Sequence, residues 1–370
     1  MKLSEFDYIL PKELIAQTPI TPRDSSRLLV LDKVTGEIED KNFFDILSYL
    51  GENDVLVLNK TKVLKARLKG EIITPCHPEL VSGSLKRNNL IYDSESSSEG
   101  QKLQKIHTSC EIFLHKQISD NTWDCLVYPG KKLKVGTKVY FDNLEGVIKE
   151  ISEDGRIVEF DKGGNEFFEI IENIGETPIP PYIKEKLEDA SRYQTVFSQE
   201  IGSVAAPTAG LHFTPELLQE LEKKGVRIEY VILHIGLGTF KSIDTENILD
   251  YNIHSEYISL DKETSNRLNI YKKSGKTIVS VGTTSTRTLE SFATKTGELT
   301  YGEKETTLYI YPGYKWLFID KLITNFHLPK SSLLVLVSSL AGQQNIKNAY
   351  NHAVDNKYRF FSFGDAMFIK

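Results

Sequence analysis

Residues 277–290 read Thr-Ile-Val-Ser-Val-Gly-Thr-Thr-Ser-Thr-Arg-Thr-Leu-Glu. The first five form a short, largely apolar run that is typical of a buried strand. Gly282 ends this run, and the segment after it predicts a turn into a helix. Strands that alternate with helices build layered α/β domains, so this stretch predicts the fold class of the chain.

The same alternation continues on the N-terminal side of this stretch. Thr214 and Pro215 predict the start of a helix, with the threonine as its cap. The apolar run 226–235 predicts the strand that follows, and Asp261 caps a second helix. This order of elements favours a layered α/β main domain.

Apolar runs nearer the two ends of the chain extend the pattern. Residues 27–32 and 54–59 predict two buried strands, and 308–311 and 317–323 predict two more. A helix is predicted after Lys330. We therefore assign residues 1–60 and 156–370 to the α/β domain.

Residues 61–155 have a different pattern, with short alternating segments, frequent turn signals and no convincing helix. This pattern is typical of a small all-β barrel, which we expect as a domain inserted into the α/β domain. Residues 74–108 interrupt it with a polar, low-complexity tract, and we expect a disordered loop expansion there.

Composition and charge exclude several classes of protein. The 370 residues carry a formal net charge of −6, which argues against a dedicated non-specific nucleic-acid binder. Three cysteines without CxxC spacing argue against a disulfide framework, and no histidine pair has metal-binding helical spacing. The longest apolar run, 333–337, is far shorter than the roughly 20 residues that cross a bilayer. We expect a cytoplasmic protein without a metal site.

Three polar, Gly-rich segments follow apolar strands, where ligands bind in open α/β sheets. They contribute Thr208, Gly210 and His212; His234, Gly236 and Gly238; and Thr283, Thr284, Ser285 and Arg287. Taken alone, the first segment favours a short loop in which the histidine is hydrogen-bonded inside the protein. The second segment fits a ligand-binding loop and a plain turn equally well. The third has five hydroxyls and an arginine, more than helix capping needs, and predicts an anion site.

Weaker candidates complete the set. His254 and Glu256 lie two residues apart, which fits a proton-handling pair, although a surface hydrogen bond explains them as well. His327 lies in a polar loop before a helix. Asp365 follows a glycine near the C-terminus, where it could cap backbone N–H groups or bind a ligand. The basic run around Lys62 and Arg67 fits both RNA contact and a solvated surface.

Together these segments resemble the S-adenosylmethionine:tRNA ribosyltransferase-isomerase family of queuosine biosynthesis. The resemblance covers nearly the whole chain and includes His-Ile-Gly-Leu-Gly-Thr-Phe at 234–240 and Thr-Asn-Phe-His-Leu-Pro at 324–329. Its other carriers are residues 6–8, 14–17, 22–28, 59–67, 192–196, 206–214, 282–290, 309–314 and 358–367. The chain departs from the family pattern at Lys62, where Arg is usual, and at Lys65, where Pro is usual.

The resemblance implies an α/β domain with an inserted barrel and a reaction in which S-adenosylmethionine donates its ribosyl group. The acceptor is 7-aminomethyl-7-deazaguanine at the wobble position of a tRNA, and the products are epoxyqueuosine-tRNA, adenine and methionine. S-adenosylmethionine is then a consumed substrate, and we expect no cofactor, no membrane partner and a monomer. An S-adenosylmethionine-dependent RNA methyltransferase and a non-catalytic tRNA-binding relative are the alternatives.

The reaction needs a base and an acid, donors for a carboxylate, and contacts to RNA. As catalytic residues we predict His212, His234 and Asp365. As substrate-binding residues we predict Thr208, Gly210, Gly236, Gly238, Thr283, Thr284, Ser285, Arg287, His254, Glu256 and His327. As tRNA-binding residues we predict Arg23, Lys62, Arg67, Arg192 and Tyr193.

Overall fold

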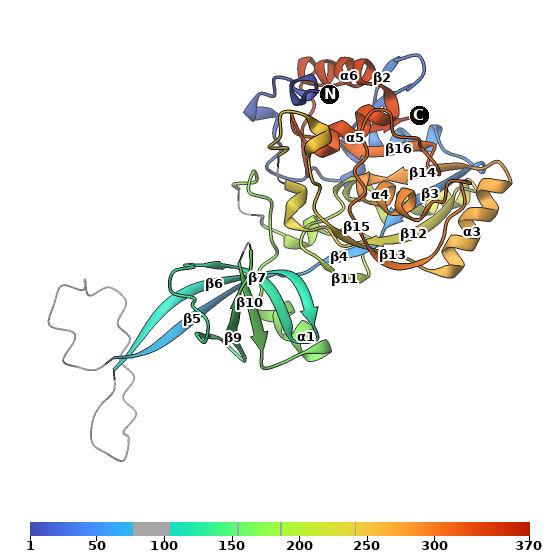
Figure 1. The fold of residues 1–370 in the computed structure, drawn as a ribbon. Coiled ribbons are helices and arrows are strands. Elements are labelled where there is room, and N and C mark those ends of the chain that lie inside the picture. Colours follow the sequence, from blue (N-terminus) through green and yellow to red (C-terminus); the bar gives the residue numbers. More distant parts are fainter. Residues whose placement is uncertain (77–103, 154, 186, 241) are drawn as a thin grey trace. The chain divides into compact units, whose positions relative to one another are not determined.

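The chain divides into two compact units in the computed structural model (Figure 1). The first comprises residues 1–63 and 179–370, and the second comprises residues 64–178. The structure describes residues 1–76, 104–153, 155–185, 187–240 and 242–370. No helix in these ranges is long and apolar enough to cross a membrane.

A nine-stranded mixed sheet forms the centre of the first unit, in the order β15-β13-β12-β3-β14-β16-β17-β1-β2. The strands are β1 (Arg27–Leu31), β2 (Ile38–Asn42), β3 (Asp54–Asn59), β12 (Arg227–Leu233), β13 (Glu256–Leu260), β14 (Thr277–Val281), β15 (Gly302–Thr306), β16 (Lys321–Asn325) and β17 (Ala366–Ile369). The strands β12, β3, β14 and β16 run parallel, as do β17 and β1, and the other neighbours are antiparallel. A separate two-stranded sheet pairs β4 (Thr61–Val63) with β11 (Glu200–Ser203).

Helices cover both faces of the large sheet. They are α2 (Pro215–Lys223), α3 (Lys262–Lys273), α4 (Gly282–Phe292), α5 (Ser332–Ala341) and α6 (Gln343–Asp355). Leu29 and Leu31 of β1 pack in the cluster that includes α5 and α6, whereas Leu28 and Val30 pack with α2. Strands that are buried on both faces read as continuous apolar runs, which explains why the sequence predicted β1 and β3.

The junction of β14 and α4 confirms the prediction from residues 277–290, with no intervening residue between strand and helix. Gly282 has φ +82°, a backbone conformation that glycine adopts at little cost. The strand predicted at 308–311 is wrong, because the carbonyl of Leu308 accepts a hydrogen bond from Arg287 Nε instead of joining a ladder. The edge strand β15 lies just before it.

The second unit is a closed antiparallel barrel with the strand order β10-β7-β6-β5-β8-β9. Its elements are β5 (Arg67–Cys76), β6 (Gln104–Ser119), β7 (Thr122–Tyr128), β8 (Lys138–Phe141), β9 (Leu144–Ile151), β10 (Arg156–Phe160) and α1 (Gly164–Ile174). The barrel confirms the predicted fold class. Its unit extends past residue 155 because β10 closes the barrel and α1 packs on it through Phe167.

The loop expansion predicted at 74–108 is wrong at both of its ends. Strand β5 continues to Cys76 and strand β6 begins at Gln104, and these two residues are directly paired in the ladder. Backbone pairing therefore extends into a polar sequence that carries no strand signal. Residues 77–103, the rest of that prediction, lie outside the described residues.

Candidate active site

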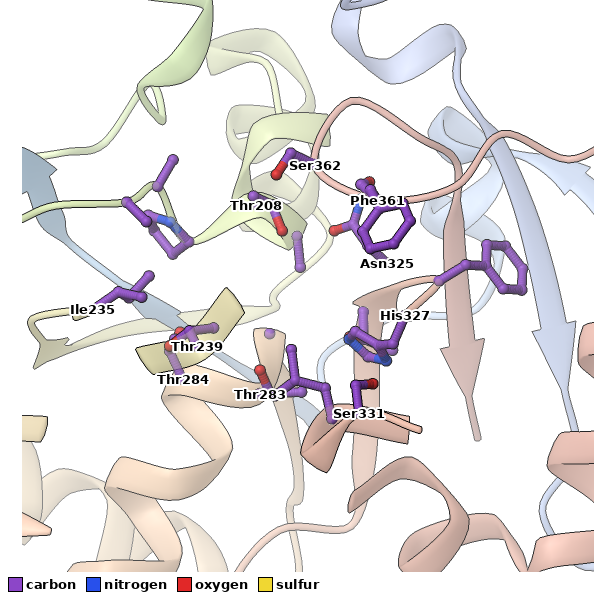
Figure 2. Close-up of a pocket in the computed structure, with 18 of the residues that line it drawn as sticks. Thr208, Ile235, Thr239, Thr283, Thr284, Asn325, His327, Ser331, Phe361 and Ser362 are labelled. Carbon is purple, nitrogen blue, oxygen red and sulfur yellow. Dashed lines mark hydrogen bonds between the residues drawn. The ribbon is translucent and has the colours of Figure 1, made fainter. Parts of the chain in front are cut away.

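A pocket lies in the first unit at the edge of the sheet where β14 and β16 end (Figure 2). Ligands bind at this edge of open α/β sheets. The space between its lining atoms, including the part that is open to solvent, is about 730 Å³. Apolar side chains, hydroxyls, one amide and one imidazole line it, and none of the described lining residues is Asp, Glu, Lys or Arg.

The N-terminus of α4 opens into this pocket through Gly282, Thr283 and Thr284. No side chain caps this helix, so its first backbone N–H groups lack the usual side-chain acceptor. The Oγ1 atom of Thr284 is buried and has no hydrogen-bond partner in the protein. Free N–H groups and the helix dipole favour an anionic group at this position.

Arg287 and Ser285 lie on the same helix but do not line the pocket. Arg287 is 5% exposed, forms an ion pair with Glu256 and donates from Nε to the carbonyl of Leu308 at 3.1 Å. Burial by itself raises the pKa of Glu256, but the Arg287 guanidinium, His254 and the hydrogen bond from Thr239 together hold that pKa below its ordinary value. The guanidinium predicted for a ligand carboxylate is therefore paired inside the protein.

Glu256 also fixes the segment that carries Thr239 to one side of the pocket. Its Oε1 accepts hydrogen bonds from Thr239 Oγ1 at 2.9 Å and from the backbone N–H of Gly236 at 3.4 Å. His254 Nε2 lies 3.4 Å from the same oxygen. A Cβ at Gly238 would lie 2.4 Å from Cγ of His254, so only glycine permits this approach. Thr239 lines the pocket, and these predicted residues position it from behind.

Thr208 lines the pocket from a 3-10 helix that spans Thr208–His212. Gly210 lies on the packed side of that helix, where an added Cβ would lie 2.8 Å from Cζ of Phe197. Its role is close packing that places Thr208 against the pocket.

His212 is buried behind the pocket with both ring nitrogens engaged. Nδ1 lies 2.7 Å from Ser26 Oγ, and Nε2 lies 3.2 Å from Nδ2 of Asn325. The ring stacks on Phe43 at 4.9 Å. Burial, with Arg359 and Arg23 nearby, lowers the pKa of His212 to about 3, so the imidazole is neutral near pH 7.

The other two candidate histidines are also neutral near pH 7. His327 lines the pocket, with Nε2 3.2 Å from Thr324 Oγ1, and burial lowers its pKa to about 3. His234 lies outside the pocket lining, with Nδ1 2.8 Å from Thr61 Oγ1, and burial lowers its pKa to about 4.

Asp365 does not line the pocket. Its two oxygens accept hydrogen bonds from the backbone N–H groups of Arg27 at 2.9 Å and Arg359 at 2.8 Å. Burial raises the pKa of Asp365 above its ordinary value in spite of these bonds. The carboxyl group joins the start of β1 to the turn before β17.

The predicted tRNA-binding residues lie in four places. Arg23 and Arg192 line a smaller cleft together with His212. Lys62 is half-buried on β4, and Arg67 lies on the barrel strand β5, where its Nε is 3.3 Å from Glu111 Oε1. Tyr193 is fully buried and packs edge-on against Phe363, so it belongs to the core in this structure.

Several polar residues that line the pocket were not selected from the sequence, among them Thr239 and Asn325. Both follow apolar strands, in segments from which only the neighbouring glycines and histidines were selected. The described residues contain no group of three or more His, Cys, Asp or Glu side chains that could hold a metal ion.

Two comparisons with known proteins bear on the family of this chain. A family model described as "Queuosine biosynthesis protein" matches residues 3–369. The crystal structure of S-adenosylmethionine tRNA ribosyltransferase from Thermotoga maritima matches with 37% sequence identity and a TM-score of 0.54. That match covers 99% of this chain and 100% of the other.

Proposed function

The chain belongs to the family of queuosine biosynthesis proteins, and we propose that it transfers and isomerises the ribosyl group of S-adenosylmethionine. The acceptor is 7-aminomethyl-7-deazaguanine at the wobble position of a tRNA, and adenine and methionine are released. The observation that carries this proposal is the match over residues 3–369, with 37% identity to a tRNA ribosyltransferase. The methyltransferase and the non-catalytic relative are not favoured by these matches.

The pocket in the first unit is our proposed site for S-adenosylmethionine. Its mostly apolar lining with a few hydroxyls and one amide suits a nucleoside with an amino-acid tail. The carboxylate of the methionine moiety is placed at the N-terminus of α4, where Thr283, Thr284 and free N–H groups meet it. Thr208 and Thr239 supply further hydroxyls along the wall.

The chemistry requires a base that removes the ribose C5′ proton next to the sulfonium and an acid that assists the departing adenine. A neutral imidazole is in the form that accepts a proton, and the low pKa values of His212 and His234 keep both neutral near pH 7. His327 is neutral as well and lines the pocket itself. We propose that the base is among these three histidines.

Variants with Gln at each of these histidines, together with Asp365→Asn, distinguish a catalytic role from a role in stability. Loss of the base lowers the rate of adenine release by roughly 10²–10⁴. Asp365 accepts two backbone N–H groups, so its variant is expected to lose stability more than rate. Single-turnover adenine release and urea unfolding distinguish the two effects.

We propose that no resident cofactor or metal takes part, because the sulfonium itself acidifies the neighbouring C–H bond. We place the enzyme in the cytoplasm and propose that it is a monomer. Light scattering on the purified protein tests the oligomeric state.

Our candidates for phosphate contacts are Arg23, Lys62, Arg67 and Arg192, because guanidinium and ammonium groups bind phosphate oxygens. Charge-removing variants should weaken tRNA binding and reduce its salt dependence.

The decisive experiment is one reaction followed by mass spectrometry. Purified protein is mixed with S-adenosylmethionine and an anticodon stem-loop that carries 7-aminomethyl-7-deazaguanine. Free adenine, free methionine and an epoxycyclopentane-modified RNA establish the proposed reaction. A methylated RNA without adenine release would instead identify an RNA methyltransferase. RNA binding without turnover would identify a non-catalytic tRNA-binding relative.

A matched pair of variants ties that activity to the pocket. Thr284→Val removes a hydroxyl that has no partner in the protein, so we expect KM for S-adenosylmethionine to rise about tenfold with little loss of stability. Thr288→Val removes a buried hydroxyl one turn along α4, which bonds only to the carbonyl of Thr284 and does not line the pocket. An unchanged KM in Thr284→Val would remove α4 from the donor site.

A further inference from the structure

The amide of Asn325 is satisfied on one side and open on the other. Its Nδ2 donates to the carbonyl of Phe361 at 3.0 Å and lies 3.2 Å from Nε2 of His212. Its Oδ1 has no hydrogen-bond partner among the described residues, although Asn325 is only 3% exposed and lines the pocket. An unpaired buried acceptor costs about 1–3 kcal/mol, so this oxygen is arranged for a ligand.

The orientation of this amide follows from its neighbours. The carbonyl of Phe361 accepts hydrogen bonds only, so the amide nitrogen must face it. The second amide hydrogen then faces Nε2 of neutral His212, so Nε2 accepts and the ring proton is assigned to Nδ1, 2.7 Å from Ser26 Oγ. Both amide hydrogens are thereby used. In Figure 2 the Asn325 oxygen is directed toward the open space of the pocket.

The pocket that Asn325 lines has no charged side chain among its described lining residues. Among the described lining residues, the walls are built largely by small and apolar side chains such as Ala205, Ala209, Ile235 and Phe326. The methionine carboxylate, which we place at the N-terminus of α4, is itself an acceptor and cannot pair with this oxygen. The open oxygen accepts but does not donate, so the ligand must bring an N–H or O–H group.

We propose that Asn325 Oδ1 accepts a hydrogen bond from the 6-amino group of the adenine of S-adenosylmethionine and so selects a 6-aminopurine donor. This inference rests on the proposed function and deepens it. A 6-oxopurine would present an oxygen to this acceptor and leave both unpaired, which is how a polar site rejects a close analogue. Ser26 and His212 hold the Asn325 amide in this orientation.

Binding of an unreactive ligand tests the inference without any requirement for turnover. S-adenosylhomocysteine and its 6-deamino analogue are titrated into the full-length protein by calorimetry. The wild type should bind the amino ligand about tenfold more tightly, and Asn325→Ala should bind both with similar affinity. Equal affinities in the wild type, or an undiminished preference in Asn325→Ala, would overturn the inference.

A further ligand and a further outcome test whether the discrimination is at the purine. An analogue without the α-amino group of the methionine moiety tests the other N–H donor of the ligand. If Asn325→Ala abolishes discrimination at that group rather than at the purine, the assignment to adenine is overturned. If the wild type binds none of these ligands, the proposed function fails and the inference falls with it.

A matched control separates pocket chemistry from folding. Asn325→Ala also removes the hydrogen bonds of the amide to the Phe361 carbonyl and to His212, so some loss of stability is expected. Ser338→Ala removes a buried hydroxyl of α5 that bonds only to the carbonyl of Leu334. It should keep the tenfold preference, and a loss of preference in this variant would mean that discrimination depends on general stability and would overturn the inference. The wild-type comparison of the two ligands stands even if Asn325→Ala does not fold.

Discussion

The buried polar residues around the pocket are of two kinds. In Arg287, Glu256 and Asp365, the polar atoms described above are paired inside the protein. Thr284 and Asn325 each keep one atom without a partner at the pocket. Substitution of the first kind leaves an unsatisfied partner and costs folding free energy, whereas substitution of the second kind removes a group that only a ligand satisfies.

Glu256 is the residue at which this distinction is sharpest. Glu256→Gln leaves the buried guanidinium of Arg287 without its countercharge, so the free energy of unfolding should fall by about 3 kcal/mol. Urea denaturation measures this change. Glu229→Gln is the control, because Glu229 is also buried but the side chain of its partner, Arg267, is 47% exposed. Equal losses in the two variants would contradict the interpretation.

At the scale of elements, the sequence predicted several of the strands that are buried on both faces, although it missed β17, whose four residues are all buried. The runs at 27–32, 54–59 and 277–281 predicted β1, β3 and β14, because burial on both faces leaves a continuous apolar signal. Strand β15 was missed because its sequence, Gly-Glu-Lys-Glu-Thr, lies at the sheet edge and is mostly exposed.

The candidate site was predictable only in part, for a related reason. Glycines and hydroxyls after a strand mark the edge of the sheet, and Thr208, Thr283 and Thr284 do line the pocket. The role of Asn325 depends on Phe361 and His212, which lie 36 and 113 residues away in the chain. No local pattern contains such a contact. The ion pair of Arg287 with Glu256 likewise depends on how the sheet brings β13 and α4 together.

The start of α4 gives the prediction at the element scale. Gly282→Ala places a side chain at φ +82°, which should lower the free energy of unfolding by about 1–2 kcal/mol. It should also shift the first turn of α4 and weaken binding of S-adenosylhomocysteine. Gly275→Ala is the matched control, because Gly275 has φ +81° and no atom within 4 Å of its added Cβ. A similar stability loss without a binding defect is expected for it, and a binding defect in both variants would contradict the prediction.

At the scale of the whole molecule, the two units differ in their buried ionisable groups. His212, His234 and His327, whose pKa values are lowered to between about 3 and 4, all lie in the first unit. The sequence has two tryptophans, and one lies in each unit: Trp123 stacks on Phe167 in the barrel, and Trp316 donates to the carbonyl of Ser339 in the first unit. Each unit therefore has its own fluorescence reporter.

Acid should unfold the first unit before the barrel. A histidine with a pKa of about 6.5 in the unfolded chain and about 3 in the folded one binds its proton only after unfolding, at any pH between these values. The free energy of unfolding of the first unit should therefore fall as the pH drops below about 6.5, by about 1 kcal/mol per histidine for each pH unit. Trp123→Phe leaves Trp316 as reporter of the first unit, and Trp316→Phe leaves Trp123 as reporter of the barrel. We expect the Trp316 transition at the higher pH, and His212→Gln should move it to lower pH. Coincident transitions, or a barrel that unfolds first, would mean that the buried histidines do not set the acid limit of this protein.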